Sequence, residues 1–179
     1  MKKTEWLRQL GYDEVAQRIT ESEAVKFSEP VNVPDTAKMD NISRIVVHHS
    51  ATSTGNAELF RLLHRAVNRW EDLGYHFVIG NGTESPDGCV EEGRKLPYQG
   101  AHARGANRNS IGVCLVGNFN DTEPTSSQLE SLRTLLRRLM KNYNIGIDGI
   151  TLHRMVKGSS TECPGKNLTL EKILLLLEK

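Results

Sequence analysis

The chain has 179 residues, and its 23 Lys and Arg residues nearly balance its 22 Asp and Glu residues, so the formal net charge is +1. This balance gives no general electrostatic attraction to nucleic acid or to acidic membranes, and a nucleic-acid partner is therefore not expected. The length suits one catalytic domain with a short appendage and is enough to bury a sizeable core.

Residues 1–40 are predicted to form an N-terminal helical extension followed by a linker. Between Thr4 and Ile19 the apolar residues fall near helical spacing and Gly11 interrupts them, which predicts two short helical pieces. The stretch from Ser28 to Asp40 contains prolines and small polar residues, as a linker or a strap over the domain would. The start of the chain lacks the continuous apolar stretch of a secretory signal peptide, so synthesis in the cytoplasm is expected.

Residues 41–179 are predicted to form the main domain. Arg44 to His49 is apolar and β-branched at its centre, which predicts a strand covered on both faces, with His48 near its C-terminal end. Asn56 to Trp70 carries an apolar stripe at helical spacing, and Gly74 ends that pattern.

The middle of the chain alternates strands with polar loops. Tyr75 to Ile79 is predicted to be a strand that continues through a hairpin into Cys89 to Glu92, because the residues between them are rich in turn formers. Ser110 to Gly117 is predicted to be a further buried strand. The polar loop before it, Gly100 to Asn109, is a candidate wall of a groove.

The last third of the chain completes the domain. Thr125 and Gln128 match a capping box at the start of a helix from Ser126 to Tyr143. A short strand, Gly149 to Leu152, leads into a polar loop, and Leu168 to Glu178 is predicted to be a closing helix whose apolar run is far shorter than the roughly 20 residues of a membrane span. Strands interleaved with helices, together with one hairpin, predict an α/β domain with a central mixed β-sheet flanked by helices.

Three residues that suit a zinc ion lie at the ends of predicted elements. His48 ends one strand, His153 follows another, and Cys163 lies ten residues further on. Zinc takes imidazole and thiolate ligands, and three protein ligands leave a fourth position for water or a substrate oxygen, as a hydrolase needs. The alternative is that both histidines are hydrogen-bonded loop residues and Cys163 is a small buried hydrophobe.

Several sequence blocks, in order, resemble the N-acetylmuramoyl-L-alanine amidases, a family that includes phage lysozyme-type amidases and the peptidoglycan recognition proteins. The resemblance runs from about Arg44 to Leu168 and is carried by Ile45 to Thr52, Gly74 to Ile79, Gly100 to Asn107, Ser110 to Gly117, His153-Arg154 and Cys163-Pro164-Gly165. It implies the fold of these proteins and Zn²⁺ held by His48, His153 and Cys163. It also implies hydrolysis of the amide bond between N-acetylmuramic acid and L-alanine in bacterial peptidoglycan.

The resemblance further implies roles for residues around the metal. Tyr75 corresponds to an active-site tyrosine, and Thr161 lies where its hydroxyl could donate to an oxyanion; the alternatives are a core aromatic and an ordinary loop threonine. His102 and Asn107 resemble groove residues that contact the glycan or the stem peptide. Arg94 is a candidate to bind a peptide carboxylate, and for each of these three the alternative is a solvated loop residue.

Two points of the site stay open at this level. His49 is expected to point away from His48 and to hydrogen-bond within the sheet or support the site from behind. The general base is undetermined, because Cys114 and Val116 stand where wall-recycling members of the family carry acidic residues. The candidates are the metal-bound water, Tyr75 and Glu92.

A wall substrate without a signal peptide fits a phage or prophage lysis enzyme that reaches the cell wall after release or export. The alternatives are a non-catalytic peptidoglycan-binding module, a cytosolic or exported amidase acting on wall fragments, and a thiol hydrolase with Cys163 as nucleophile and His153 as base. Residues 1–40 could bind an intracellular protein partner or pack onto the domain.

Overall fold

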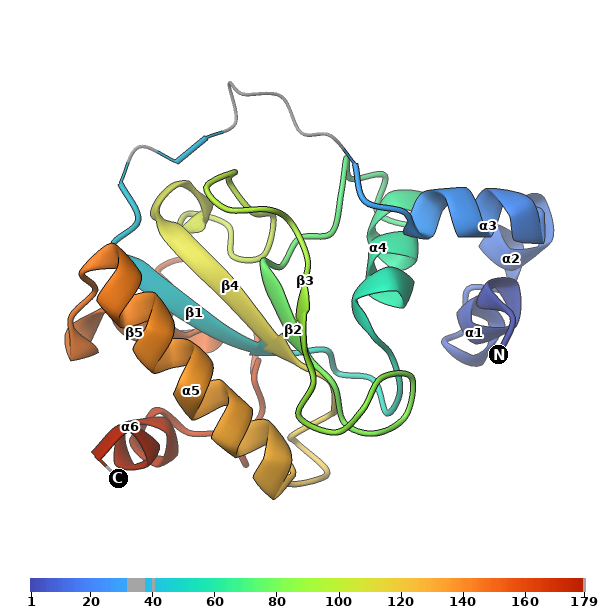
Figure 1. Ribbon diagram of the computed structural model, residues 1–179. Coiled ribbons are helices and arrows are strands. Elements are labelled where there is room, and N and C mark those ends of the chain that lie inside the picture. Colours follow the sequence, from blue (N-terminus) through green and yellow to red (C-terminus); the bar gives the residue numbers. More distant parts are fainter. Residues whose placement is uncertain (32–37, 40, 179) are drawn as a thin grey trace.

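The computed structural model describes residues 1–31, 38–39 and 41–178, and within them a five-stranded mixed sheet forms the centre of the molecule (Figure 1). The strands lie in the order β3-β2-β4-β1-β5. They comprise β1 (Arg44–His49), β2 (Phe77–Ile79), β3 (Val90–Glu92), β4 (Ser110–Leu115) and β5 (Ile150–Leu152). All neighbouring pairs are parallel except the β2–β3 hairpin, which confirms the predicted mixed sheet.

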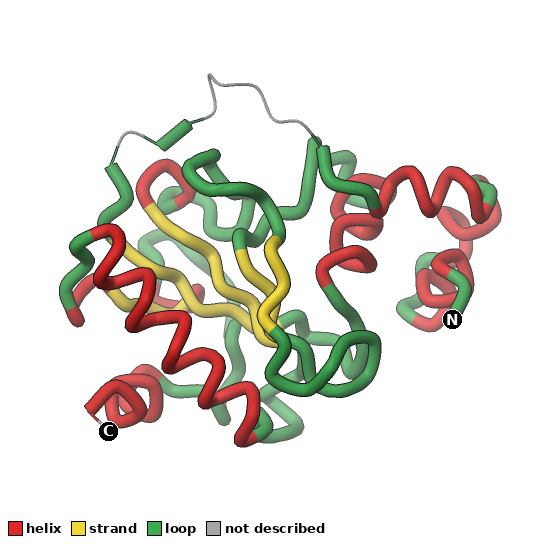
Figure 2. Tube along the Cα trace, in the orientation of Figure 1, coloured by secondary structure: helices red, strands yellow, loops and turns green. Residues whose placement is uncertain are grey.

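Helices and long loops enclose this sheet (Figure 2). The α-helices are α1 (Lys3–Gln9), α2 (Asp13–Arg18), α3 (Glu21–Ser28), α4 (Ala57–Ala66), α5 (Ser126–Tyr143) and α6 (Leu170–Glu178). Short 3-10 helices are η2 (Asn107–Asn109), η3 (Ile147–Gly149) and η4 (His153–Met155). No helix of the described residues is both long enough and apolar enough to cross a membrane.

The two faces of the sheet have different partners because side chains alternate along each strand. Val47 on β1 belongs to a core that it shares with α5 and α6. Val46 belongs to a small cluster with Ala103 and Ala106, in the loop that precedes β4. His48 follows the alternation of Val46 and lies beside Cys114 of β4, so its side chain is on the face away from α5.

Element boundaries follow the predictions closely where local chemistry sets them. Thr125 and Gln128 form the predicted capping box, and α5 has the predicted bounds. The helix predicted over Asn56 to Trp70 ends earlier, at Ala66, because the chain turns at Arg69, which has a positive φ of 58°.

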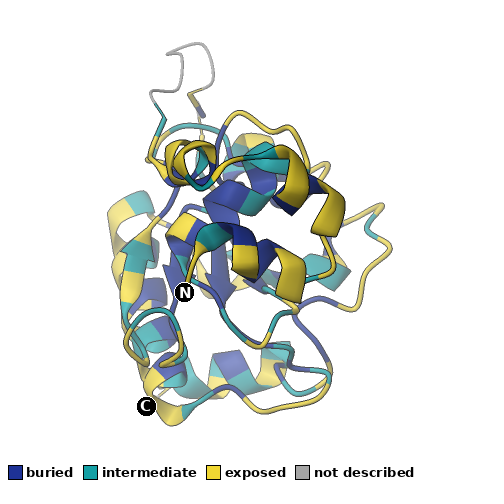
Figure 3. Ribbon diagram, turned by 90° about the vertical axis from the view of Figure 1, so that its right-hand side faces the viewer, coloured by how far each residue is buried: buried dark blue, intermediate teal, exposed yellow. Residues whose placement is uncertain are grey.

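The N-terminal extension forms three helices, one more than predicted, and they pack outside α4 (Figure 1). Trp6 is fully buried, and its ring centroid lies 6.0 Å from that of Phe60 on α4. Figure 3, which faces this side of the molecule, shows exposed outer surfaces on these helices and buried residues beneath them. Of the two roles considered for residues 1–40, the structure shows packing onto the domain for α1 to α3. Most of the predicted linker lies outside the described residues.

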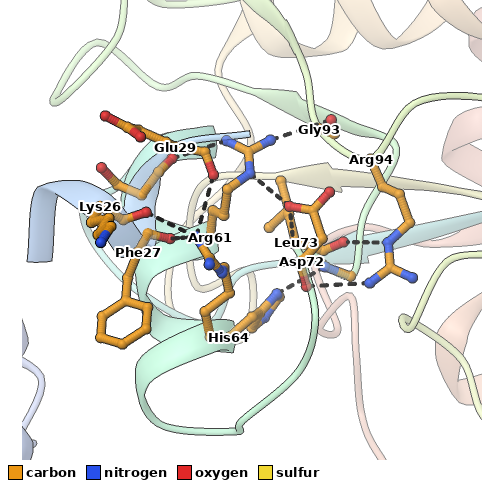
Figure 4. Close-up of polar contacts among 12 residues, drawn as sticks. Lys26, Phe27, Glu29, Arg61, His64, Asp72, Leu73, Gly93 and Arg94 are labelled. Carbon is orange, nitrogen blue, oxygen red and sulfur yellow. Dashed lines mark hydrogen bonds and ion pairs between the residues drawn. The ribbon is translucent and has the colours of Figure 1, made fainter. Parts of the chain in front are cut away.

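A buried ion pair ties α3, α4 and the hairpin together (Figure 4). Arg61 Nε on α4 lies 2.7 Å from Asp72 Oδ1, and both side chains are almost fully buried. The Arg61 guanidinium also donates to the carbonyls of Ser28, at the end of α3, and of Gly93, just after β3. A buried charge is tolerated when it is paired and hydrogen-bonded, as the Arg61 guanidinium is here.

The same region fixes the backbone that leads into Tyr75. Arg94 donates to the carbonyls of Asp72 and Leu73, at 3.3 and 2.9 Å. The Gly74 amide donates to His64 Nδ1 at 2.9 Å (Figure 4). Three consecutive residues before Tyr75 are therefore held by buried side chains, which limits where the tyrosine can lie.

Candidate metal centre

Two histidines and one cysteine come together at the C-terminal ends of β1 and β5. One side-chain donor atom each from His48, His153 and Cys163 lies within 4.8 Å of the others, and within the described part of the chain this is the group of His, Cys, Asp or Glu residues that could hold a metal. His48 Nδ1 is 3.7 Å from Cys163 Sγ. Tetrahedral zinc bonds to nitrogen and sulfur place two such ligands ~3.5 Å apart, so this donor set fits zinc in both chemistry and spacing.

Cys163 is positioned by backbone groups from two directions. The His49 amide donates to Cys163 Sγ at 3.4 Å. The Arg154 amide donates to the Cys163 carbonyl at 2.8 Å, and the Arg154 guanidinium donates to the carbonyl of Gly165 at 2.8 Å and to that of Leu168 at 3.3 Å. Arg154 thus joins the loop of His153 to the loop of Cys163, a role that the sequence analysis missed although it noted the adjacent His153-Arg154 pair.

The ionisation of Cys163 bears on what the thiol can do. Burial raises the pKa of the Cys163 thiol to about 11, although the His49 amide and the charge of Arg154 lower it. Without a metal the thiolate fraction is therefore very small at neutral pH. A coordinating metal stabilises the thiolate, so this residue suits a ligand better than a free nucleophile.

The second ring nitrogen of His48, Nε2, also has a hydrogen-bond partner within the protein. His48 Nε2 lies 3.0 Å from His102 Nδ1, and His102 Nε2 lies 3.3 Å from the Ser110 carbonyl oxygen. Burial lowers the pKa of both histidines well below the usual value, so both rings are neutral. His102 is 7% exposed and uses both nitrogens within the protein, so this arrangement does not support the predicted contact with the glycan or the stem peptide, which stays a prediction.

The other predicted substrate contacts are also engaged within the protein. Arg94 is buried, and besides Asp72 and Leu73 its guanidinium donates to the Gln99 carbonyl at 2.7 Å. This arrangement does not support a role for Arg94 in binding a peptide carboxylate. Asn107 is half-buried, and its Oδ1 accepts from the amides of His102 and Ala103. Substrate contact by Asn107 stays a prediction.

Tyr75 lies against the metal donors. Its ring centroid is 5.2 Å from that of His48. Burial, with smaller contributions from Cys114 and Cys163, raises the pKa of the Tyr75 phenol well above its usual value. The phenol therefore keeps its proton at neutral pH and can act as a hydrogen-bond donor.

Thr161 is exposed on the loop that carries Cys163. Its Oγ1 accepts from the Cys163 amide at 3.2 Å, which is the local side-chain to backbone bond considered as the alternative in the sequence analysis. Among the described residues Thr161 Oγ1 is found only as an acceptor, so a role of its hydroxyl as a donor toward substrate stays a prediction.

His49 and Glu92 lie on the opposite face of the sheet from His48. His49 Nδ1 accepts from the Phe119 amide at 3.1 Å, as expected for a residue that hydrogen-bonds away from the metal. Glu92 pairs with Phe77, whose side chain belongs to the core shared with α5. The proposed role of Glu92 as general base is therefore wrong, because the sheet separates its carboxylate from the donor group.

Comparison with known proteins finds similarity over most of the chain. A family described as N-acetylmuramoyl-L-alanine amidase matches residues 38–166. Peptidoglycan-recognition protein SC2 of Drosophila melanogaster is 36% identical over 141 residues, which cover 74% of this chain and 73% of that protein. The endolysin of Escherichia phage T7 is 38% identical over 138 residues, which cover 72% of this chain and 84% of the endolysin.

The fold is likewise similar to that of a solved amidase. The N-acetylmuramoyl-L-alanine amidase LysC from Clostridium intestinale URNW superimposes with a TM-score of 0.67 at 32% identity. The match covers 83% of this chain and 95% of that one. The family match starts at residue 38, so the helices α1 to α3 lie outside it.

Proposed function

The chain belongs to the N-acetylmuramoyl-L-alanine amidase family, and we propose that it hydrolyses the amide bond between N-acetylmuramic acid and L-alanine in bacterial peptidoglycan with the aid of zinc. The observation that carries the proposal is the convergence of His48, His153 and Cys163, whose donor atoms lie within 4.8 Å of one another. A protein that only bound peptidoglycan would not need these three ligands together.

The residues present suit a catalytic zinc site. His48, His153 and Cys163 would hold the ion and leave a fourth position open, as catalytic sites do. A bound zinc ion supplies Lewis acidity, which activates water near pH 7 and polarises the scissile carbonyl. The His49 amide, directed at Cys163 Sγ, stabilises the thiolate that such a site requires.

Tyr75 and Thr161 are proposed to act on the substrate. Tyr75 keeps its phenolic proton because burial raises its pKa, and its ring lies beside His48. It can therefore donate a hydrogen bond to the oxygen on which negative charge develops. Thr161 is exposed two residues before Cys163 and offers a second, neutral donor. Asn107, on the loop before β4, is retained as a candidate substrate contact.

We expect Tyr75→Phe to lower kcat about a hundredfold, because removal of one donor to a developing oxyanion typically costs that much. The ring remains to pack against His48, so zinc content should not change. Turnover of a purified muropeptide and zinc content would be measured on the same preparation. Tyr143→Phe, on α5, is the matched control, and equal activity of the two variants would remove Tyr75 from the mechanism.

Two other readings are less well supported. A non-catalytic recognition module is favoured by the name of the relatives called peptidoglycan recognition proteins, but it leaves the preserved donor group without a role. A thiol hydrolase needs a reactive thiolate, and the pKa of about 11 for Cys163 opposes one.

The setting we propose is lysis of a bacterial host by a phage or prophage. The similarity to phage endolysins supports this setting, in which the enzyme is made in the cytoplasm and reaches the wall after the membrane is opened. An amidase acting on soluble wall fragments, or one that is exported, would carry out the same chemistry. Release of stem peptides from intact sacculi, compared with cleavage of soluble muropeptides, separates these settings.

The test of the function is metal dependence measured together with product release. We expect one equivalent of zinc by elemental analysis and new free stem peptides from purified sacculi. Treatment with a chelator should abolish release, and added zinc should restore it. Binding to sacculi without zinc and without cleavage would instead establish a recognition module.

A further inference from the structure

A pair of buried histidines connects the backbone of β4 to the metal donor group. His102 Nε2 lies 3.3 Å from the Ser110 carbonyl oxygen, and His102 Nδ1 lies 3.0 Å from His48 Nε2. At the far end, His48 Nδ1 lies 3.7 Å from Cys163 Sγ. The contacts form one continuous line from a fixed backbone group to the metal position.

The contact between the Ser110 carbonyl and His102 determines which ring nitrogens of His102 and His48 carry a hydrogen. A carbonyl oxygen can only accept, so His102 Nε2 carries the hydrogen, and in the neutral ring Nδ1 is then an acceptor. His48 Nε2 must donate to that acceptor, which leaves the lone pair of His48 on Nδ1. Nδ1 is the nitrogen that faces Cys163. The Ser110 carbonyl thus selects, through His102, which nitrogen of His48 is available to a metal.

We propose that His102 is a positioning residue that fixes the tautomer and the ring orientation of His48 for metal binding. The proposal rests on the proposed zinc site and replaces the substrate contact first predicted for His102. Histidine ligands of metals commonly donate their second N–H to a protein acceptor, which raises the basicity of the ligand and holds its ring. Here the acceptor is another histidine instead of a carboxylate.

The surroundings of His102 are shaped to hold its ring. A Cβ added at Gly112 would lie 2.5 Å from His102 Cγ, and one added at Gly100 would lie 2.5 Å from His102 Cδ2. Asn107 Oδ1 accepts from the His102 amide at 3.0 Å, which fixes the backbone beneath the ring. A side chain at either glycine would collide with the ring, so the two glycines leave the space that the ring of His102 occupies.

Other buried histidines lack this connection. His64 Nδ1 accepts from the Gly74 amide. His76 bonds to two backbone groups, the Gly112 amide and the Tyr98 carbonyl. Neither histidine contacts a metal donor through a ring nitrogen in these bonds, and His64, which is as exposed as His102 at 7%, is therefore the matched control for zinc binding.

The test compares zinc affinity of the full-length protein with that of His102→Ala and His102→Asn, by competition with a chromophoric chelator. We expect His102→Ala to bind zinc about 10- to 100-fold more weakly, as loss of such a supporting partner typically does. His102→Asn keeps an acceptor close to the position of Nδ1 and should recover most of the affinity. The visible spectrum of the cobalt-substituted protein should change in His102→Ala and not in His64→Ala.

A second readout does not need the metal. Long-range nitrogen–proton NMR spectra of the metal-free protein should show His48 with its hydrogen on Nε2 in the parent and a mixture of tautomers in His102→Ala. Unchanged zinc affinity in His102→Ala, or an equal loss in His64→Ala, would overturn the proposal. If the parent itself binds no zinc, the proposed function fails, and the tautomer of His48 still decides the role of His102.

Discussion

Replacing Cys163 with serine is expected to remove the zinc and to lower amide hydrolysis on the order of 10³-fold or more. Cys163 supplies the only sulfur in the donor group that the described residues form. A serine hydroxyl is neutral at pH 7 and a much poorer zinc ligand than a thiolate. Metal-ion catalysis supplies several kcal/mol of transition-state stabilisation, and each 1.36 kcal/mol is about a factor of ten in rate, which sets the size of the expected loss.

The measurement is zinc content by elemental analysis together with release of stem peptides from sacculi, for the parent and for Cys163→Ser. Cys89→Ser is the control, because Cys89 is a half-buried free cysteine in the hairpin before β3. Loss of activity with zinc retained would point to a nucleophilic thiol and would favour the thiol hydrolase. Retention of both zinc and activity would show that the metal lies elsewhere.

The three candidate metal donors were predicted from the sequence, whereas the residues that support them were not. That prediction rested on the resemblance of the blocks around His48, His153 and Cys163 to the amidase family, because their spacing alone follows no short zinc-binding pattern. The sequence could not show that His102 turns inward, because a polar loop without periodicity gives no information on side-chain direction. Gly100 and Gly112 leave the room that the buried ring needs, but Gly112 belongs to β4 and comes near His102 only in the folded chain, so nothing in the sequence indicated this contact.

Glu92 shows that the sequence did not reveal on which face of the sheet a strand residue lies. Its distance along the chain from Tyr75 says little about proximity, because a strand places successive residues on opposite faces. Pairing of Glu92 with Phe77 puts its carboxylate on the α5 side, whereas the next residue, Glu91, accepts from the Ala57 amide at the start of α4. A shift of one residue in register would have exchanged these two roles.

The third helix of the N-terminal extension could have been predicted from its capping residues. Thr20 and Glu23 form a capping box at the start of α3, the same pattern that correctly located α5. No helix was predicted over Glu21 to Ser28, whose apolar stripe is weak. Packing against α4, including the bond from Arg61 to the Ser28 carbonyl, completes a helix that its own composition supports only weakly.

Trp6→Ala is expected to lower the free energy of unfolding by about 3–5 kcal/mol, a large share of the roughly 5–15 kcal/mol that stabilises most domains. The indole is fully buried against Phe60, and its Nε1 donates to Thr54 Oγ1 at 3.2 Å. The substitution would leave a cavity between α1 and α4 and an unpaired hydroxyl on the loop that follows β1. Denaturant unfolding followed by circular dichroism gives the change directly.

Tyr12→Ala is the matched control, because Tyr12 lies on the same extension with 36% of its surface exposed and should change stability by no more than about 0.5 kcal/mol. The comparison separates the two roles considered for residues 1–40. If the extension serves mainly to bind a protein partner, Trp6→Ala will leave unfolding nearly unchanged. If it is a part of the domain, the loss appears in the isolated protein, and amidase activity per folded molecule persists because neither α1 nor α4 supplies a metal donor.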